Sequence, residues 1–141
     1  MTLQRILVPI DGSDGAARAL ILADELAEKT EGELTLLQVI EEEDPLPSFW
    51  DRVPEGVDRV DYLADQRYRA IESTLTSLRA RYERRVEQGY AAEVICKVAE
   101  QDAFDLIVIG RRGLTPVTRF MLGSTSDRVV HHAPCAVLVA R

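Results

Sequence analysis

Three glycines and a run of hydroxyl side chains in the second half of the chain have the spacing of an anion-binding site. Two residues separate Gly110 from Gly113, and nine separate Gly113 from Gly123. Three hydroxyl residues follow the last of these glycines: Ser124, Thr125 and Ser126. Glycine lets the backbone approach a ligand closely, so that amide N–H groups can surround an anion. A helix beginning at the hydroxyl residues would add its unpaired N–H groups and the positive end of its dipole. The pattern predicts a phosphate site.

A second interpretation of the same glycines stays open, because glycine is also the commonest residue in turns and caps. The chain has no Gly-x-x-x-x-Gly-Lys-Ser/Thr sequence, and its first apolar segment is not followed by a Gly-x-Gly-x-x-Gly turn. The phosphate interpretation therefore depends on the combination of an apolar segment before the first glycine with a Ser/Thr-rich helix start after the last.

The elements that must position these residues alternate between strand and helix. Near-continuous apolar runs, typical of strands buried on both faces of a parallel sheet, occupy residues 5–10, 34–40, 105–109 and 135–139. Helical spacing of apolar residues separates them, at 16–27, 60–78, 92–99 and after 123. Ser13 is the expected N-cap of the first helix, and Gly32 is expected to end it. Residues 82–87 fit either a helix extension or a charged edge strand.

This alternation predicts a single α/β domain over residues 1–141. We expect three layers, with an open, twisted, mostly parallel sheet of five strands and about four helices. Ligands of such sheets bind beyond the carboxyl ends of the strands. Asp11 follows the first strand, Val39 lies near the end of the second, and Gly110 follows Ile109 at the end of another. The three positions are therefore expected to share one site.

The composition of the chain limits which binding partners and which cellular compartment are expected. Lys and Arg total 17 against 24 Asp and Glu, a formal charge of -7. An acidic surface is poorly suited to nucleic acid or to anionic membranes. No apolar run approaches the roughly 20 residues that span a bilayer, and the N-terminus lacks the features of a signal peptide. Two cysteines, Cys96 and Cys135, fit buried thiols of a reducing compartment. We therefore expect a cytoplasmic protein.

Several other residues offer weaker chemistry. The acidic run from Glu41 to Asp44 begins a proline-containing loop over 41–56 and is interpreted as a solvated loop start, with magnesium binding as the alternative. His131 and His132 are adjacent on a helix and so point in different directions, which disfavours a shared metal. Two interpretations stay open for Arg111 and Arg112: they contact phosphate, or they only balance the acidic surface.

Taken together, the motifs resemble the universal stress protein (UspA-like) family along essentially the whole chain. The resemblance rests on the spaced glycines with Ser124 and on four segments, ILVPIDGS at 6–13, LTLLQV at 34–39, DLIVIG at 105–110 and HAPCAVLV at 132–139. The spacing Gly-x2-Gly-x9-Gly-Ser/Thr is that of the family's ATP-binding branch. The chain departs from the family at Gly89-Tyr90-Ala91, where Gly-Asp-Pro is usual, and in a short segment before the third strand.

The resemblance implies a fold like that of the adenine nucleotide alpha hydrolases and a role for each matched position. Asp11 would lie by the ribose and help to hold a divalent metal, magnesium or manganese. The backbone of Val39 would meet the adenine edge, and Pro9 and Ile10 would line the pocket, with Ile109 also in the site. The remaining matched residues would hold the ribose and the phosphates: Gly110, Gly113, Gly123, Ser124, Thr125 and Ser126.

The expected function is that of a stress-response regulator that binds ATP, ADP or AMP without rapid turnover. The alternative is a slow ATP-hydrolysing or phosphoryl- or nucleotidyl-transferring enzyme. Fast phosphoryl transfer requires a cationic clamp and a positioned base, and both lysines, Lys29 and Lys97, fall on helices away from the glycines.

A homodimer is also expected, through the apolar strand from Cys135 to Val139, which ends the chain without a covering helix. Many members of the family dimerise through this strand. The alternative is a monomer in which the 41–56 loop covers that edge.

Overall fold

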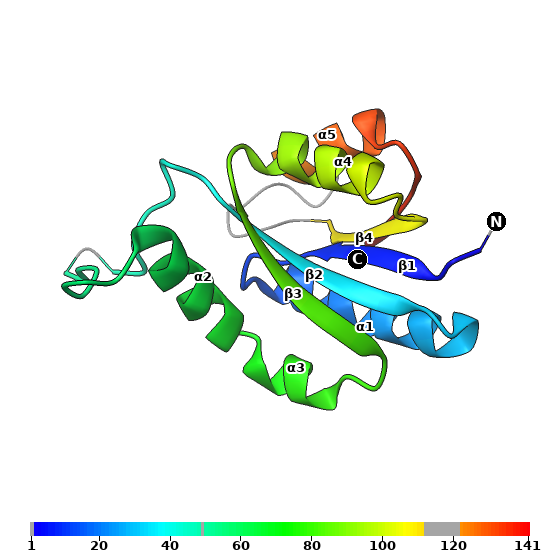
Figure 1. The fold of residues 1–141 in the computed structure, drawn as a ribbon, viewed down its shortest axis with the longest axis horizontal. Coiled ribbons are helices and arrows are strands. Elements are labelled where there is room, and N and C mark those ends of the chain that lie inside the picture. The colour runs from blue at the N-terminus through cyan, green and yellow to red at the C-terminus, as the bar shows by residue number, and fades with distance from the viewer. Residues whose placement is uncertain (1, 49, 112–121) are drawn as a thin grey trace.

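The computed structural model describes residues 2–48, 50–111 and 122–141 of the chain, and within them it contains one five-stranded sheet (Figure 1). The strands are β1 (Arg5–Pro9), β2 (Glu33–Ile40), β3 (Arg81–Gln88), β4 (Leu106–Gly110) and β5 (Ala136–Ala140). They pair in the order β3-β2-β1-β4-β5, and every pair is parallel. Because the chain runs outward from β1 in both directions, the strand order reverses between β1 and β4. The predicted parallel sheet of five strands is confirmed.

Helices cover both faces of the sheet: α1 (Asp14–Thr30), α2 (Arg59–Arg69), α3 (Glu72–Ser77), α4 (Ala91–Gln101) and α5 (Ser124–His132). The described residues thus hold five helices where about four were expected. The single helix expected over 60–78 is divided, because Ile71 leaves the helical conformation at φ -113° and ψ 23°. Ile71 and Leu75 are nevertheless both buried, as their helical spacing predicts.

Successive side chains of the strands point to opposite faces of the sheet and pack into two separate hydrophobic cores. Ile6, Val8 and Val108 pack with α1 on one face, while Leu7, Ile107 and Ile109 pack with α4 and α5 on the other. A strand with both faces covered must be apolar at nearly every position. This requirement explains why the inner strands appear in the sequence as unbroken apolar runs.

The two ends of α1 were predicted with unequal success. Ser13 caps the N-terminus as expected, its hydroxyl accepting the Ala16 N–H at 3.2 Å. The left-handed residue after the helix is Glu31, at φ 56°, and not Gly32. Gly32 is needed for a different reason, because a Cβ there would lie 2.6 Å from the carbonyl oxygen of Leu3.

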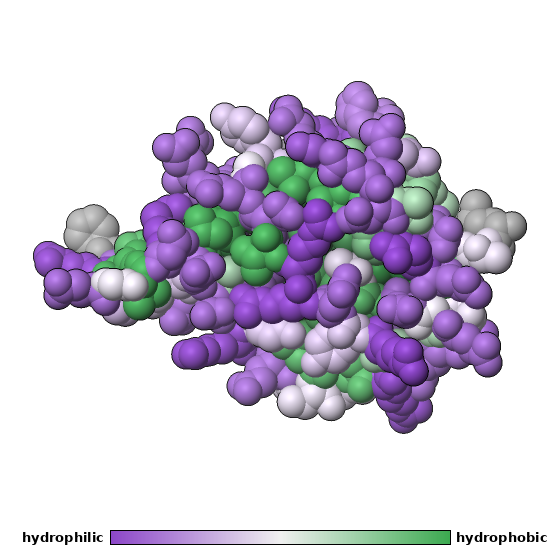
Figure 2. All heavy atoms as spheres, viewed as in Figure 1, coloured by the Kyte–Doolittle hydropathy of each residue, from purple (hydrophilic) through white to green (hydrophobic). Residues whose placement is uncertain are grey.

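The two edge strands differ in character. Residues 81–88 form β3, so the helix extension considered for this region is wrong and the charged edge strand is confirmed. Figure 2 shows that hydrophilic residues cover most of the face on which β3 and α2 lie. The opposite edge is β5, whose residues from Ala136 to Val139 are half-buried. No helix in the described part of the chain is long and apolar enough to cross a membrane.

Candidate functional site

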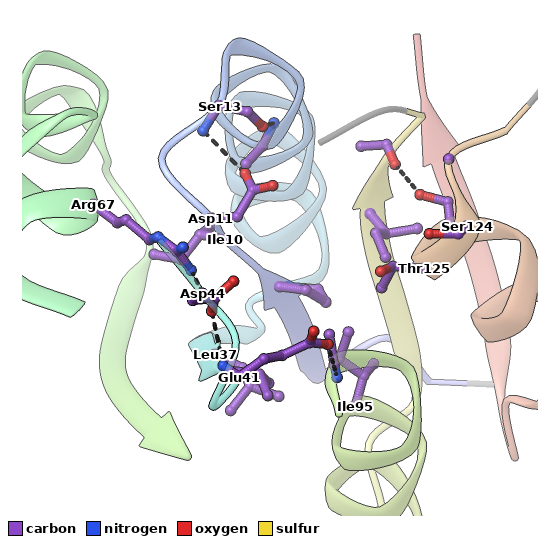
Figure 3. Close-up of a pocket in the computed structure, with 18 residues that line it drawn as sticks. Ile10, Asp11, Ser13, Leu37, Glu41, Asp44, Arg67, Ile95, Ser124 and Thr125 are labelled. Carbon is purple, nitrogen blue, oxygen red and sulfur yellow. Dashed lines mark hydrogen bonds and ion pairs between the residues drawn. The ribbon is translucent and has the colours of Figure 1, made fainter. Parts of the chain in front are cut away.

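A cavity of about 480 Å³ lies at the carboxyl ends of β1, β2 and β4, where the strand order reverses (Figure 3). Most residues predicted from the sequence line this one cavity: Pro9, Ile10, Asp11, Val39, Ile109, Gly110, Gly123, Ser124, Thr125 and Ser126. Gly113 lies outside the described residues. The carboxyl ends of neighbouring parallel strands necessarily meet at one edge of the sheet, which is why residues distant in sequence converge here.

Asp11 is positioned by the turn between β1 and α1. Its Oδ1 accepts the backbone N–H of Ser13 at 3.0 Å, and the side chain lines the cavity. No described residue donates a hydrogen bond to the other carboxylate oxygen, Oδ2. Asp11 therefore retains an acceptor for a sugar hydroxyl or a cation.

The wall opposite carries the beginning of α5. Gly123 occupies the N-cap, and no side chain caps this end of the helix. Its own N–H is engaged, donating to the carbonyl of Arg111 at 2.8 Å. Ser124 and Thr125 are at the first turn, where backbone N–H groups have no partner within the helix. This end of α5 can therefore accept an anion.

Gly110 and Ser126 also have structural roles that could not be predicted from the sequence. A Cβ on Gly110 would lie 2.7 Å from the carbonyl carbon and oxygen of Gly15, so glycine is required for β4 to approach the start of α1. The buried Ser126 hydroxyl donates to the carbonyl of Gly110 at 2.6 Å. These two residues line the cavity and also hold α1, β4 and α5 together around it.

A third wall consists of Glu41, Asp44 and Arg67, of which the sequence pattern singled out the two carboxylates, as part of an acidic loop start, but not Arg67. Glu41 accepts the Ala91 N–H at 2.9 Å and so caps α4, whose N-cap residue supplies no side-chain bond. Asp44 accepts the Glu41 N–H at 2.7 Å and pairs with Arg67 at 3.1 Å. The interpretation of this acidic run as a solvated loop start is wrong for both carboxylates, which fold back onto α4 and α2.

One signal could have identified Arg67. It lies four residues after the buried Leu63 and four before the buried Ile71, on the helix face that the pattern assigns to the core. A lone arginine on an apolar stripe indicates a buried partner or a cavity. The partner, Asp44, is 23 residues away in sequence, and only the tertiary structure brings the two together.

The remaining candidates do not join the site. His131 Nδ1 lies 2.7 Å from the carbonyl oxygen of Asp127, and no group of three metal-ligating side chains occurs among the described residues. Cys96 and Cys135 are half-buried and not fully buried, and burial raises the pKa of both thiols. A raised pKa keeps a thiol protonated and therefore weakly nucleophilic. Arg111 is half-buried beside β5, and Arg112 lies outside the described residues.

Fold and cavity together define a Rossmann-like α/β protein with a cavity at the switch point of a parallel sheet. The sequence model described as "Universal stress protein family" matches residues 2–141. A relative from Staphylococcus aureus (strain USA300), whose name places it in the same family, is 32% identical over 143 residues, covering 100% of this chain and 86% of its own. The chain belongs to the universal stress protein family.

Solved structures agree with this assignment. The universal stress protein UspA from Lactobacillus plantarum superposes with a TM-score of 0.73 at 27% identity, covering 100% of this chain and 99% of its own. A universal stress protein in complex with cAMP gives 0.70 at 20% identity, covering 100% and 98%. An Arabidopsis thaliana family member with AMP bound gives 0.59 at 19% identity, covering 97% and 90%. The last two establish likeness of fold.

Proposed function

We propose that the cavity binds an adenine nucleotide, ATP, ADP or AMP, and that the protein acts in the cytoplasm as a nucleotide-responsive regulator of a stress response. The observation that carries this proposal is the cavity itself, which places the uncapped start of α5 and the carboxylate of Asp11 around the carboxyl ends of β1, β2 and β4. Two universal stress proteins of the same fold are described with cAMP and with AMP bound, which adds support.

The lining residues suggest how the ligand lies. The first-turn N–H groups at Ser124 and Thr125 suit the phosphates, because they combine unpaired donors with the positive end of the helix dipole. The free oxygen of Asp11 suits a ribose hydroxyl. Val39, with Pro9 and Ile10, offers apolar surface and backbone groups to the base.

A divalent cation would fit this arrangement only together with the nucleotide. Magnesium binds to one or two carboxylates and completes its coordination with phosphate oxygens and water. Asp11 is the one carboxylate on the described wall whose charge is neither paired with an arginine nor used to cap a helix. Asp11 would thus hold the cation while the phosphates supply further ligands.

We infer that binding, and not rapid turnover, is the activity. Phosphoryl transfer needs a positioned base for the attacking water as well as a clamp for the phosphates. Among the described lining residues, the side chains able to accept a proton are Asp11, Glu41 and Asp44. Each already accepts a backbone N–H, and the free oxygen of Asp11 is the one assigned above to the ribose or the cation.

Filling the cavity tests the proposal directly. Val39→Trp places an indole at the cavity wall and should abolish binding of ATP and AMP in titration calorimetry, because the base loses its space. The matched control is Val57→Trp, since Val57 is exposed and does not line the cavity. The control should bind as the unchanged protein does. Equal affinity in Val39→Trp, or no heat from any adenine nucleotide with the unchanged protein, would contradict the proposal.

We also propose a homodimer built on β5. This strand pairs only with β4 among the described elements, so one row of backbone groups remains available to an antiparallel copy. Glu41 and Asp44 of the loop considered as an alternative cover make their contacts with α4 and α2.

Light scattering at micromolar concentration should give a mass near twice 15.8 kDa. Val137→Lys, which puts a charge on this strand, should move the mass toward that of one chain. A single-chain mass for the unchanged protein at every concentration would exclude the dimer.

A further inference from the structure

The Asp44–Arg67 ion pair on the cavity wall opposite α5 has properties that favour a role in ligand binding. Both side chains are largely buried, with exposed fractions of 20% and 15%. Withdrawing two charges from water is costly, and their mutual attraction often repays no more than that cost, so a buried pair is poor evidence of a purely stabilising role. The pair also lines a cavity in which ligand atoms can reach it.

The hydrogen bonds of the pair leave a defined pattern of donors and acceptors. Oδ2 of Asp44 accepts two bonds, from the Glu41 N–H at 2.7 Å and from Arg67 Nη1 at 3.1 Å. No described residue donates to Oδ1 of Asp44, and none accepts from Nε or Nη2 of Arg67. The pair therefore offers an acceptor and neighbouring donors to the cavity that it lines.

The helix that carries Arg67 is held firmly to the sheet. The buried Gln38 of β2 donates from Nε2 to the carbonyl of Ala64 at 2.8 Å, and its Oε1 accepts from Arg84 Nε at 2.8 Å. Arg84 also pairs with Asp65 at 3.0 Å. These contacts fix the backbone of α2 one turn or less from Arg67. A group held in this way loses little conformational entropy on binding.

Resting on the proposed function, we propose that Asp44 and Arg67 recognise the nucleobase, Asp44 accepting from an exocyclic amino group and Arg67 donating to an adjacent ring nitrogen. Adenine presents these two groups side by side. The phosphates are drawn to α5, and Asp44 and Arg67 lie on the side of the cavity away from Ser124 and Thr125, which leaves their wall for the base (Figure 3). A 6-oxopurine would turn a carbonyl oxygen toward the Asp44 carboxylate. Both groups only accept hydrogen bonds, so no hydrogen bond could form between them.

Asp44→Asn gives a sharp test, because two donors fix the orientation of the new amide. The Glu41 N–H and Arg67 Nη1 both require an acceptor at the Oδ2 position, so the amide NH₂ group must occupy the Oδ1 position. The variant then offers a donor where the unchanged protein offers an acceptor. We expect the ratio of AMP affinity to inosine monophosphate affinity, measured by calorimetry, to fall by at least about tenfold.

The matched control is Arg59→Gln. Arg59 donates to the backbone carbonyl of Asp44 but does not line the cavity, so this variant loosens the same segment without changing any ligand contact. The affinity ratio should stay that of the unchanged protein. Arg67→Gln provides a second test, and we expect it to weaken AMP binding by about tenfold while circular dichroism shows the native fold.

The outcomes separate this inference from the proposed function. If the unchanged protein binds neither nucleotide, the proposed function fails and base recognition fails with it. If AMP binds but Asp44→Asn leaves the ratio unchanged, or weakens both nucleotides equally, the pair has only a structural role and this inference is overturned. If Asp44→Asn does not fold, Arg67→Gln is the test that remains. Unchanged AMP affinity in Arg67→Gln would then contradict this inference.

Discussion

Gly110→Ala is expected to lower the free energy of unfolding by about 1–3 kcal/mol, toward the upper end of that range. The added Cβ would lie 2.7 Å from the carbonyl carbon and oxygen of Gly15 and 3.1 Å from the N of Ala16. These neighbours are backbone atoms at the start of α1, so they cannot rotate away as a side chain would. Urea denaturation followed by circular dichroism should show a lower midpoint with an unchanged m-value.

The same variant distinguishes two reasons for a glycine at this position. If Gly110 serves only the approach of a phosphate, alanine would leave stability unaltered and weaken nucleotide binding alone. An unchanged denaturation midpoint would therefore contradict a structural requirement for glycine between β4 and α1. Loss of both stability and affinity is the expected result, because the end of β4 is part of the cavity wall.

Asp24→Ala is expected to cost about 1–3 kcal/mol for each backbone N–H that loses its acceptor. Asp24 is a buried carboxylate on α1 that accepts the N–H of Ala80 at 2.9 Å and that of Arg79 at 3.1 Å. These bonds attach α1 to the segment between α3 and β3. Alanine offers no acceptor, and thermal or chemical unfolding should report the loss.

Two comparisons make the measurement specific. Asp24→Asn keeps one acceptor oxygen and should lose less stability than alanine does. Glu25→Ala changes an exposed residue on the same helix and should alter stability by no more than about 0.5 kcal/mol. Equal effects of Asp24→Ala and Glu25→Ala would show that the buried bonds contribute little.

The parts of the fold that could be predicted depend on local or repetitive patterns. The inner strands are apolar throughout because both faces are covered, and the predicted binding residues converge because strand ends in a parallel sheet share an edge. β3 remained ambiguous because an edge strand needs no apolar run, and its charges at Arg84 and Glu87 fit a helix surface equally well. In each case the extent to which a strand is buried determined whether it could be predicted from its sequence.

The parts that could not be predicted depend on contacts between distant segments. Arg67 meets Asp44 in the cavity wall because the loop after β2 turns back toward α2. The requirement for glycine at Gly110 comes from its distance to Gly15, which no sequence spacing encodes. The family resemblance identified the residues that match the family's motif. It could not identify the cavity wall formed by Asp44 and Arg67, because those residues lie outside the motif.

The unlike edges of the sheet have a consequence for polymerisation. Five of the eight residues of β3 are charged, whereas β5 contains none. Joining the β5 edge of one molecule to the β3 edge of another would strip water from those charges, and a net charge of -7 adds repulsion between copies. Head-to-tail addition, which is the geometry that grows without limit, is therefore disfavoured. Two β5 edges can meet only once, so the sheet can extend by a single copy and then stops.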